Sequence, residues 1–199
     1  MSISAAEEAN IIAQNGSTIL PTGTASLVTQ PFAQTFDRRL AISAAVAPTS
    51  GTLTMTAIWL PAGKTVTGIT FVSGATAESG GTQLYYALYD RNLTLLAQAT
   101  VNTGAAAFGA NTAFRMALAS PYNLTYTGLY YLGFMCTQSA GAVPTLLNIT
   151  SGVANNNGSI TGMTPIVAAT SSTGLSTGTA PNPAGALTAI VNAYYAFVD

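Results

Sequence analysis

From about residue 40 onward, short apolar stretches with a period of two are separated by turn residues. In one of them, residues such as Met55 and Trp59 alternate with threonines, as in a half-buried β-strand. About eight such strands predict an all-β fold for residues 40–199, an antiparallel β-sandwich of the jelly-roll type. The expected strands are Thr52–Leu60, Thr65–Ser73, Thr82–Tyr89, Leu93–Thr100, Thr112–Ala119, Leu129–Cys136, Pro144–Thr150 and Leu187–Val198.

Residues 1–39 follow a different pattern, which predicts an N-terminal arm. Ser4 and Glu7 have the spacing of a capping box, so we expect a short helix that ends at Asn15-Gly16. Residues 17–36 then have no clear period but too many apolar side chains for a solvated linker. An extended arm that lies on a neighbouring surface explains both properties, and a flexible tail is the alternative. The expected anchors of the arm are Ile19, Leu20, Phe32 and Phe36.

Residues 151–186 form a low-complexity insert in the expected β-domain. The insert is rich in Asn, Ser, Thr, Gly and Pro, and it contains the asparagine run at residues 155–157. A loop of this length is uncommon in a compact domain and is often functional or ordered by a neighbour. Asn156 is therefore a candidate for contact with a partner or a glycan.

The chain carries few charges, with five Lys/Arg, six Asp/Glu and no His in 199 residues. Charged residues make up 6% of it, whereas about 25% is usual. The densest basic cluster is the pair Arg38 and Arg39, which argues against nucleic acid or an anionic membrane surface as partner. No apolar run reaches the roughly 18 residues that suggest a membrane span, and the acidic start is unlike a secretory signal peptide.

The residue types that carry most enzyme chemistry are scarce. Glu78 and Asp90 are the only acidic pair in the body of the β-domain, and each lies in an expected turn rather than across a substrate site. Cys136 lies in an apolar run with no histidine to activate it, so we expect a buried thiol. Zinc and calcium ligand patterns are missing from the sequence. We expect no enzymatic activity, no metal and no cofactor.

Tyrosines recur in the expected strands, often as adjacent pairs. Neighbouring side chains in a strand face opposite ways, so one tyrosine of each pair is expected to point outward or into an interface. Tyr85, Tyr89 and Tyr130 are therefore candidates for a protein interface or for stacking on sugar rings. Half-buried packing with the hydroxyl groups in water is the alternative.

The central half of the chain resembles a known group of proteins. The segments that carry the resemblance are TAIWLPAGKTVTGITFVSG (56–74), GGTQLYYALYDRNLTLLAQAT (80–100), NTAFRMALASPY (111–122) and TGLYYLGFMCT (127–137). In small structural proteins of actinobacterial tailed phages, a Leu-Pro-Ala-Gly turn, a Leu-Tyr-Asp turn followed by Leu-Leu-Ala, and a Gly-Leu-Tyr-Tyr strand recur in that order. The resemblance implies a virion protein with a β-sandwich and no catalytic residues.

We therefore expect a virion structural protein on the exterior of the particle, made in the cytoplasm of a bacterial host. The leading interpretation is a capsid decoration or cement protein, a homotrimer whose arm binds the major capsid protein and neighbouring copies. Uncharged side chains suit this role because their burial at an interface costs little desolvation. The alternative is a tail-tip or fibre module that binds host cell-wall carbohydrate.

Overall fold

The computed structural model describes residues 31–100, 108–150 and 166–199, and the chain divides into two compact units between Gln30 and Pro31. The expected helix, Ile19, Leu20 and Asn156 lie outside the described residues. The sequence placed the start of the β-domain at residue 40, whereas the second unit already begins at Pro31. The reason is backbone pairing, because the amide of Phe32 donates to the carbonyl of Val198 at 3.1 Å.

The described residues form β-strands and a single turn of 3-10 helix, η1 (Arg38–Leu40), with Asp37 as its N-cap. The strands are β1 (Ala33–Gln34), β2 (Ile42–Val46), β3 (Thr54–Leu60), β4 (Thr65–Val72), β5 (Gly81–Asp90), β6 (Leu95–Gln98), β7 (Ala113–Asn123), β8 (Gly128–Gln138), β9 (Leu146–Thr150), β10 (Ala168–Thr170), β11 (Thr188–Ala189), β12 (Asn192–Tyr194) and β13 (Ala196–Val198). Strands β3 to β9 agree with the sequence prediction to within a few residues at each end.

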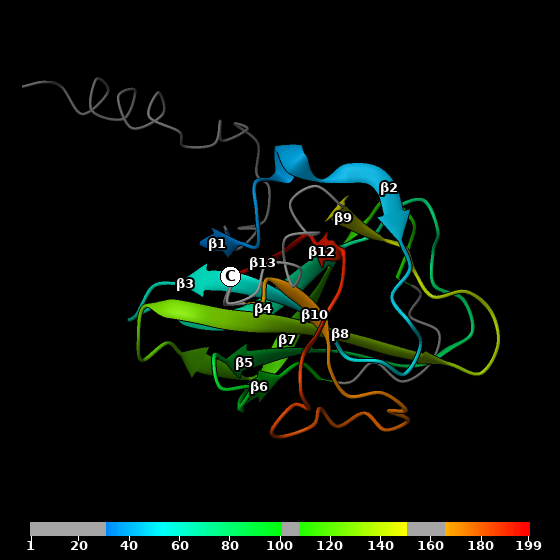
Figure 1. The fold of residues 1–199 in the computed structure, drawn as a ribbon. Helices are drawn as coiled ribbons and strands as arrows, with labels where there is room; N and C mark the ends of the chain where they lie inside the picture. The colour runs from blue at the N-terminus through cyan, green and yellow to red at the C-terminus, as the bar shows by residue number, and fades with distance from the viewer. Residues whose placement is uncertain (1–30, 101–107, 151–165) are drawn as a thin grey trace, which may run out of the picture. The chain divides into compact units, whose positions relative to one another are not determined.

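Two sheets face each other across the core (Figure 1). One has the strand order β1-β13-β4-β7, and the other has the order β11-β10-β3-β8-β5-β6. From β3 to β8 the chain changes sheet at every step except the β5–β6 hairpin. This connectivity is that of a jelly roll, and its strand pairs are antiparallel. The predicted antiparallel β-sandwich is confirmed.

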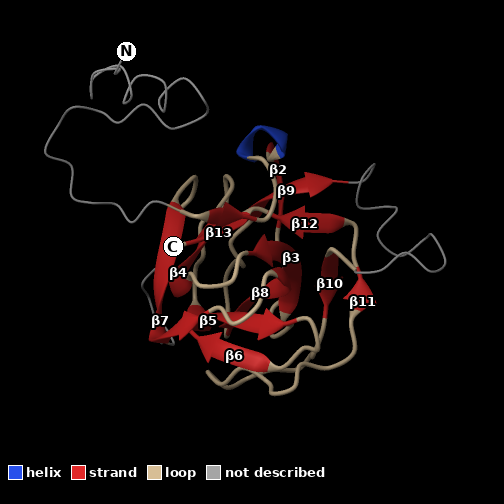
Figure 2. Ribbon diagram, turned by 90° about the vertical axis from the view of Figure 1, so that its left-hand side faces the viewer, coloured by secondary structure: helices blue, strands red, loops and turns tan. Residues whose placement is uncertain are grey.

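A third sheet with the order β12-β9-β2 lies along one edge of the sandwich, at the top of Figure 2. Its strand β12 belongs to the stretch Leu187–Val198, which the sequence predicts as one strand. That prediction is wrong, because the stretch forms three short strands, β11, β12 and β13, one in each sheet. The chain changes direction near Val191 without a glycine or proline, so no local residue type signals the breaks.

The main apolar core lies between the two facing sheets. At its centre the rings of Phe71, Tyr86 and Phe134 have centroids 4.9 to 5.7 Å apart. Alternate residues of β5 and β8 supply one wall, and β4 and β7 supply the other. We call this cluster the inner core, and it includes Ile58, Leu60, Val66, Ile69, Leu88, Tyr130, Leu132 and Val198.

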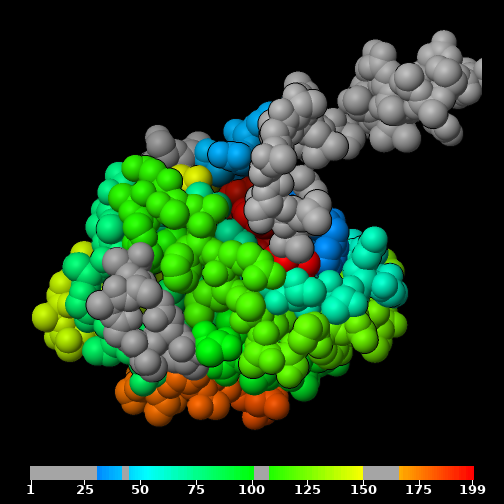
Figure 3. Space-filling model, turned by 180° about the vertical axis from the view of Figure 1, so that it is seen from behind, coloured from blue at the N-terminus to red at the C-terminus, as the bar shows by residue number. Residues whose placement is uncertain are grey.

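The opposite face of the six-stranded sheet is covered as well. Residues 171–187, which we call the strap, run across it as irregular chain and bury Ala180 and Ala184 against the sheet. This outer core also includes Leu53, Met55, Ala57, Tyr85, Ala87, Tyr89, Tyr131 and Met135. In Figure 3 the strap (orange) follows the lower margin of the sandwich. The described part of the expected insert is therefore ordered by its own domain, with β10 paired to β3.

Hydrogen bonds from β5 and β6 hold the strap in place. The Gln98 side chain donates from Nε2 to the carbonyl of Gly178 and accepts at Oε1 from the amide of Ala180. On the next strand, the Tyr89 hydroxyl donates to the carbonyl of Pro181 at 3.0 Å. The strap thus covers this face where a further sheet could pack, and side chains of the six-stranded sheet form hydrogen bonds with its backbone.

Candidate interaction surface

Two of the four expected arm anchors belong to the sandwich itself. Phe32 packs against the inner core, and the ring of Phe36 meets the ring of Tyr195 edge-on, with centroids 5.5 Å apart. Both phenylalanines flank β1, which pairs with β13, and both are half-buried, so their role as anchors on a partner stays a prediction. The other two anchors, Ile19 and Leu20, lie outside the described residues.

The tyrosines singled out from the sequence are buried. Tyr85, Tyr89 and Tyr130 each have 0% of their surface exposed, so the expectation that they point outward is wrong. The pleat does separate Tyr130 from Tyr131, with the first in the inner core and the second in the outer core. Because the strap covers the outer face of the six-stranded sheet, the tyrosine side chains on both faces of the sheet are buried.

The surroundings of these tyrosines are structural. The Tyr130 hydroxyl donates to the carbonyl of Tyr126 at 2.9 Å, and the two rings stack with centroids 4.6 Å apart. Burial raises the pKa of Tyr85 and of Tyr130 to about 12, and burial raises the pKa of Tyr89 as well. Phenols in this state do not ionise near neutral pH.

Three of the four acids of the second unit have a structural task. Asp37 pairs with Arg39, and the Asp199 carboxylate accepts hydrogen bonds from Arg115 at 2.9 and 2.6 Å. The Asp90 carboxylate accepts from the amides of Asn92 and Thr94, both at 2.8 Å, which closes the β5–β6 turn. These contacts leave none of the three carboxylates placed as half of a catalytic pair.

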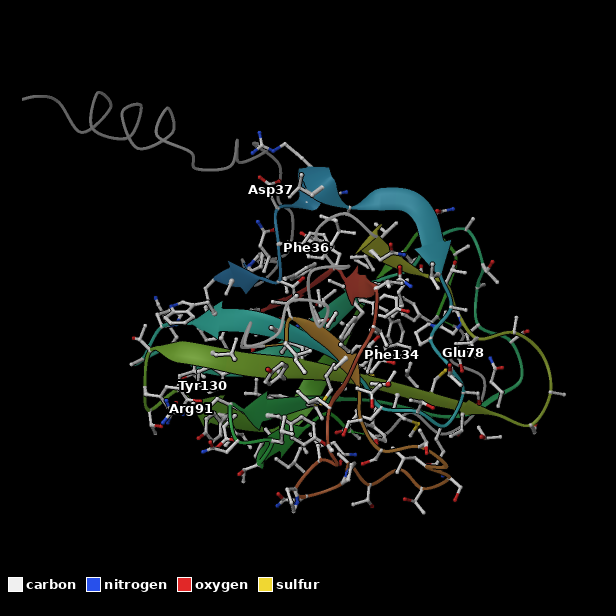
Figure 4. The ribbon with its side chains drawn as sticks, viewed as in Figure 1. Phe36, Asp37, Glu78, Arg91, Tyr130 and Phe134 are labelled. Carbon is white, nitrogen blue, oxygen red and sulfur yellow. The ribbon has the colours of Figure 1, made fainter. Side chains whose placement is uncertain are left out.

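Glu78 is the remaining acid, and it is buried with 8% of its surface exposed. Burial raises the pKa of its carboxyl above the ordinary value, and a hydrogen bond with the Phe108 backbone opposes that rise. In Figure 4 it lies at the other end of the sandwich from Arg91 and Tyr130. Cys136 is buried nearby, and burial raises the pKa of its thiol to about 12. Within the described ranges no three His, Cys, Asp or Glu side chains gather as metal ligands.

Among the described residues, the most exposed large apolar side chain lies in a strand whose alternation predicts it to be half-buried. Trp59 has 67% of its surface exposed at the end of β3. Its Cα partner on β8 is the half-buried Leu129, and continuing the β8–β5 register by one residue brings Arg91 opposite Leu129. The available signal was that Trp59 is the only tryptophan of the chain and stands just before the Pro61 turn.

Two wide depressions mark the surface elsewhere. The larger, which we call the Thr82 hollow, has a volume of about 340 Å³. Its rim is uncharged, and Thr82 and Thr137 share a hydrogen bond of 2.7 Å across it. Gln138 also lines it, and its buried Nε2 has no hydrogen-bond partner within the described part of the chain. The other, of about 300 Å³, is lined by Val46, Ala47, Pro48, Thr49, Thr54, Thr170, Ile190, Val191, Asn192 and Tyr194.

Comparison of the chain with protein-family models gives no match, and comparison with curated proteins gives none either. Over the described ranges, the structure holds no helix of the length and hydropathy that crossing a bilayer would require.

Proposed function

We propose that the chain is a structural protein of a bacteriophage virion, which decorates or cements the capsid. The observation that carries the proposal is the division of the chain at Gln30. The second unit is a β-sandwich with few charges, and its acids form ion pairs, accept hydrogen bonds from turn amides or are buried. The first thirty residues form a separate unit. Such a sandwich suits contact with protein surfaces rather than the movement of protons.

In this proposal residues 1–30 attach the protein to the major capsid protein, and the sandwich projects from the particle. Ile19 and Leu20 are the proposed anchors, because Phe32 and Phe36 are used inside the sandwich. Burial of two aliphatic side chains contributes about 3 kcal/mol of binding free energy, which is more than a hundredfold in affinity. Neighbouring copies, as a trimer, complete the proposed assembly.

The test uses the full chain with Ile19→Asp and Leu20→Asp combined, and cosedimentation with capsids purified without the protein. We expect the double variant to lose at least about a hundredfold in affinity, since the apolar contacts are lost and each charge would have to be desolvated at the interface. Leu40→Asp is the matched control, because Leu40 is exposed on η1 of the sandwich unit. Equal binding by the double variant and the wild type, or absence of the protein from purified virions, would overturn the proposal.

The second candidate is carbohydrate binding by a tail-tip or fibre module. For this candidate we propose the Thr82 hollow as the site in place of the buried tyrosines, because its uncharged hydroxyl and amide groups suit a neutral sugar. Binding of cell-wall polysaccharide by the full chain, lost in Gln138→Leu and kept in Gln34→Leu, would favour it. Gln34 is an exposed glutamine on β1. Immunogold labelling of phage heads rather than tails would support the capsid proposal over the tail-tip or fibre proposal.

A further inference from the structure

At the end of the sandwich around Trp59, the described residues leave an apolar surface exposed next to positive charge. We call Trp59, Leu129 and Arg91 the Trp59 patch. Residues 59 and 129 are paired across β3 and β8, and residue 91 follows directly after the last β5 pair, so the three lie in one row across adjacent strands. Two strand spacings separate the Cα atoms of Trp59 and Arg91 by about 10 Å. Arg91 lies at this end beside Tyr130 (Figure 4).

The positive charge at this end is not neutralised locally. Asp90 turns its carboxylate to the amides of its own turn, and in the described part of the chain neither Arg91 nor Lys64 forms an ion pair. Lys64 lies in the β3–β4 turn, which begins two residues after Trp59. The Gly63 amide of this turn donates to the Leu124 carbonyl of the β7–β8 turn at 2.9 Å. Arg39 and Arg115, by contrast, are paired with acids.

A segment of complementary chemistry exists in the same chain. Residues 1–30 contain Glu7 and Glu8 and no Lys or Arg, which gives a side-chain charge of −2. Residues 31–199 contain all five basic residues and the other four acids, which gives +1. In the helix that the capping box predicts, Glu7, Glu8, Ile11 and Ile12 are spaced i, i+1, i+4 and i+5 and share one face.

We propose that residues 7–12 of one copy of this chain bind the Trp59 patch of a second copy. Ile11 and Ile12 cover Trp59 and Leu129, and the two glutamates face Arg91 and Lys64. The occupant is assigned to a second copy, and the same contact within one chain is an outcome that the concentration series below distinguishes. Residues 13–30 extend to at most about 60 Å, enough to reach a neighbouring molecule. This contact between copies is separate from the proposed attachment to the capsid through Ile19 and Leu20.

Trp59 reports on this contact directly, because it is the only tryptophan of the chain. The experiment follows the tryptophan emission maximum, acrylamide quenching and the sedimentation coefficient of the purified full chain over a range of concentrations. We expect the emission to move to shorter wavelength, the quenching to fall and the mass to rise over the same concentrations. No capsid is present, so failure here is distinct from failure of the capsid proposal.

A charge exchange tests which surfaces meet. Glu7→Arg with Glu8→Arg makes both the arm and the patch positive, and Lys64→Glu with Arg91→Glu makes both negative. We expect each double variant alone to associate at least tenfold more weakly, and an equimolar mixture of the two to recover association. Arg38→Glu, a change at an exposed arginine on η1, serves as the control and should leave association unchanged.

Three outcomes would overturn the proposal. In the first, the mixture associates no better than the separate variants, so the exchanged charges do not meet. In the second, Trp59 is shielded to the same degree at every concentration, which assigns the cover to the same chain. In the third, copies associate while Trp59 stays fully quenchable, which places the contact on another surface.

Discussion

The two faces of the six-stranded sheet bury similar residues by different means. On the inner face, Phe134 and its neighbours meet the side chains of a second sheet. On the outer face, Met135 and its neighbours meet the strap, an irregular segment that places small residues such as Ala180 over large ones. One face is therefore closed by packing of strands alone, and the other by packing together with side-chain hydrogen bonds to a loop backbone.

The difference bears on how each face responds to damage. A second sheet is fixed by its own backbone ladder, so it cannot move into a space left by a deleted side chain. The strap has no continuous ladder. Single backbone hydrogen bonds join it to Gly51, Leu53 and Leu93, and the side chains of Gln98 and Tyr89 hold its backbone as well. Cavities should therefore cost more on the inner face than on the outer face.

Neighbouring residues of β8 provide the largest test of this comparison. Phe134 and Met135 are both 0% exposed, with the first in the inner core and the second in the outer core. We expect Phe134→Ala to lower the free energy of unfolding by about 4 kcal/mol and Met135→Ala by about 2 kcal/mol, because the strap can close part of the cavity. Urea unfolding followed by circular dichroism measures both. A larger loss for Met135→Ala would mean that the strap is the more rigid cover.

The hydroxyl groups beneath the strap provide a smaller test. Tyr89→Phe removes the donor to Pro181 and should lower the free energy of unfolding by about 1 kcal/mol. Tyr85→Phe is its matched control, because the buried Tyr85 hydroxyl has no hydrogen-bond partner in the described part of the chain, and we expect no loss. Thermal unfolding compares the two, and amide exchange at Ala180 locates the effect. Equal losses would contradict this account of how the strap is held.

The carboxyl of Glu78 adds a pH dependence at one end of the sandwich. Its raised pKa means that the folded state holds the proton more tightly, so its stabilising contribution is complete below the ordinary pKa and is lost as the pH rises through the folded pKa. The stability of Glu78→Gln relative to the wild type should therefore increase between pH 4 and pH 8. Chemical unfolding across this range measures it.

Asp37→Asn is the control for that measurement. The hydrogen bonds with Arg39 lower the pKa of Asp37 to about 2, so its contribution is present above its ordinary pKa and is lost as the pH falls toward 2. The stability of Asp37→Asn relative to the wild type should stay constant between pH 5 and pH 8. Parallel curves for the wild type and Glu78→Gln would show that Glu78 titrates as an ordinary surface carboxyl.

The smallest expected effect is at Trp59, which belongs to neither core cluster of the described residues. Trp59→Ala should change the free energy of unfolding by less than about 0.5 kcal/mol in dilute solution, because 67% of the side chain is exposed. Leu60→Ala, at the fully buried next residue, should cost about 3 kcal/mol. Thermal unfolding of both variants checks the contrast. A loss above about 1 kcal/mol for Trp59→Ala would place this residue within the fold rather than on a surface for partners.

The sequence was sufficient to predict the strands of the jelly roll. It was not sufficient to predict which segments cover the two faces of its sheets. Thr65–Ser73 and Leu129–Cys136 were predicted close to β4 and β8, because their apolar period and flanking turn residues are local properties. The burial of Tyr85 and Tyr89 depends on the strap, which joins the sheet from about ninety residues further along the chain. An apolar alternation with a period of two indicates that the strand has two faces. It does not indicate whether other parts of the chain bury both of them.

The exposed site was missed for the reverse reason. Trp59 continues the apolar alternation of β3, so by pattern it resembles Met55, which is fully buried. What separates them is the cover, since Met55 belongs to the outer core that the strap closes, whereas Trp59 lies outside that cluster. Local sequence does not encode which residues are covered.

The place of β13 in its sheet has a consequence for the order of folding. β13 lies between β1 and β4, so Ala33 pairs with Val198 and the sheet cannot accept β1 until residues 196–198 are present. During synthesis, the strands from β3 to β8 can pair while β1 waits for a partner at the far end of the chain. Closing a loop of this length makes the pairing slow, and until it forms the β13 side of β4 is an open edge exposed to other chains.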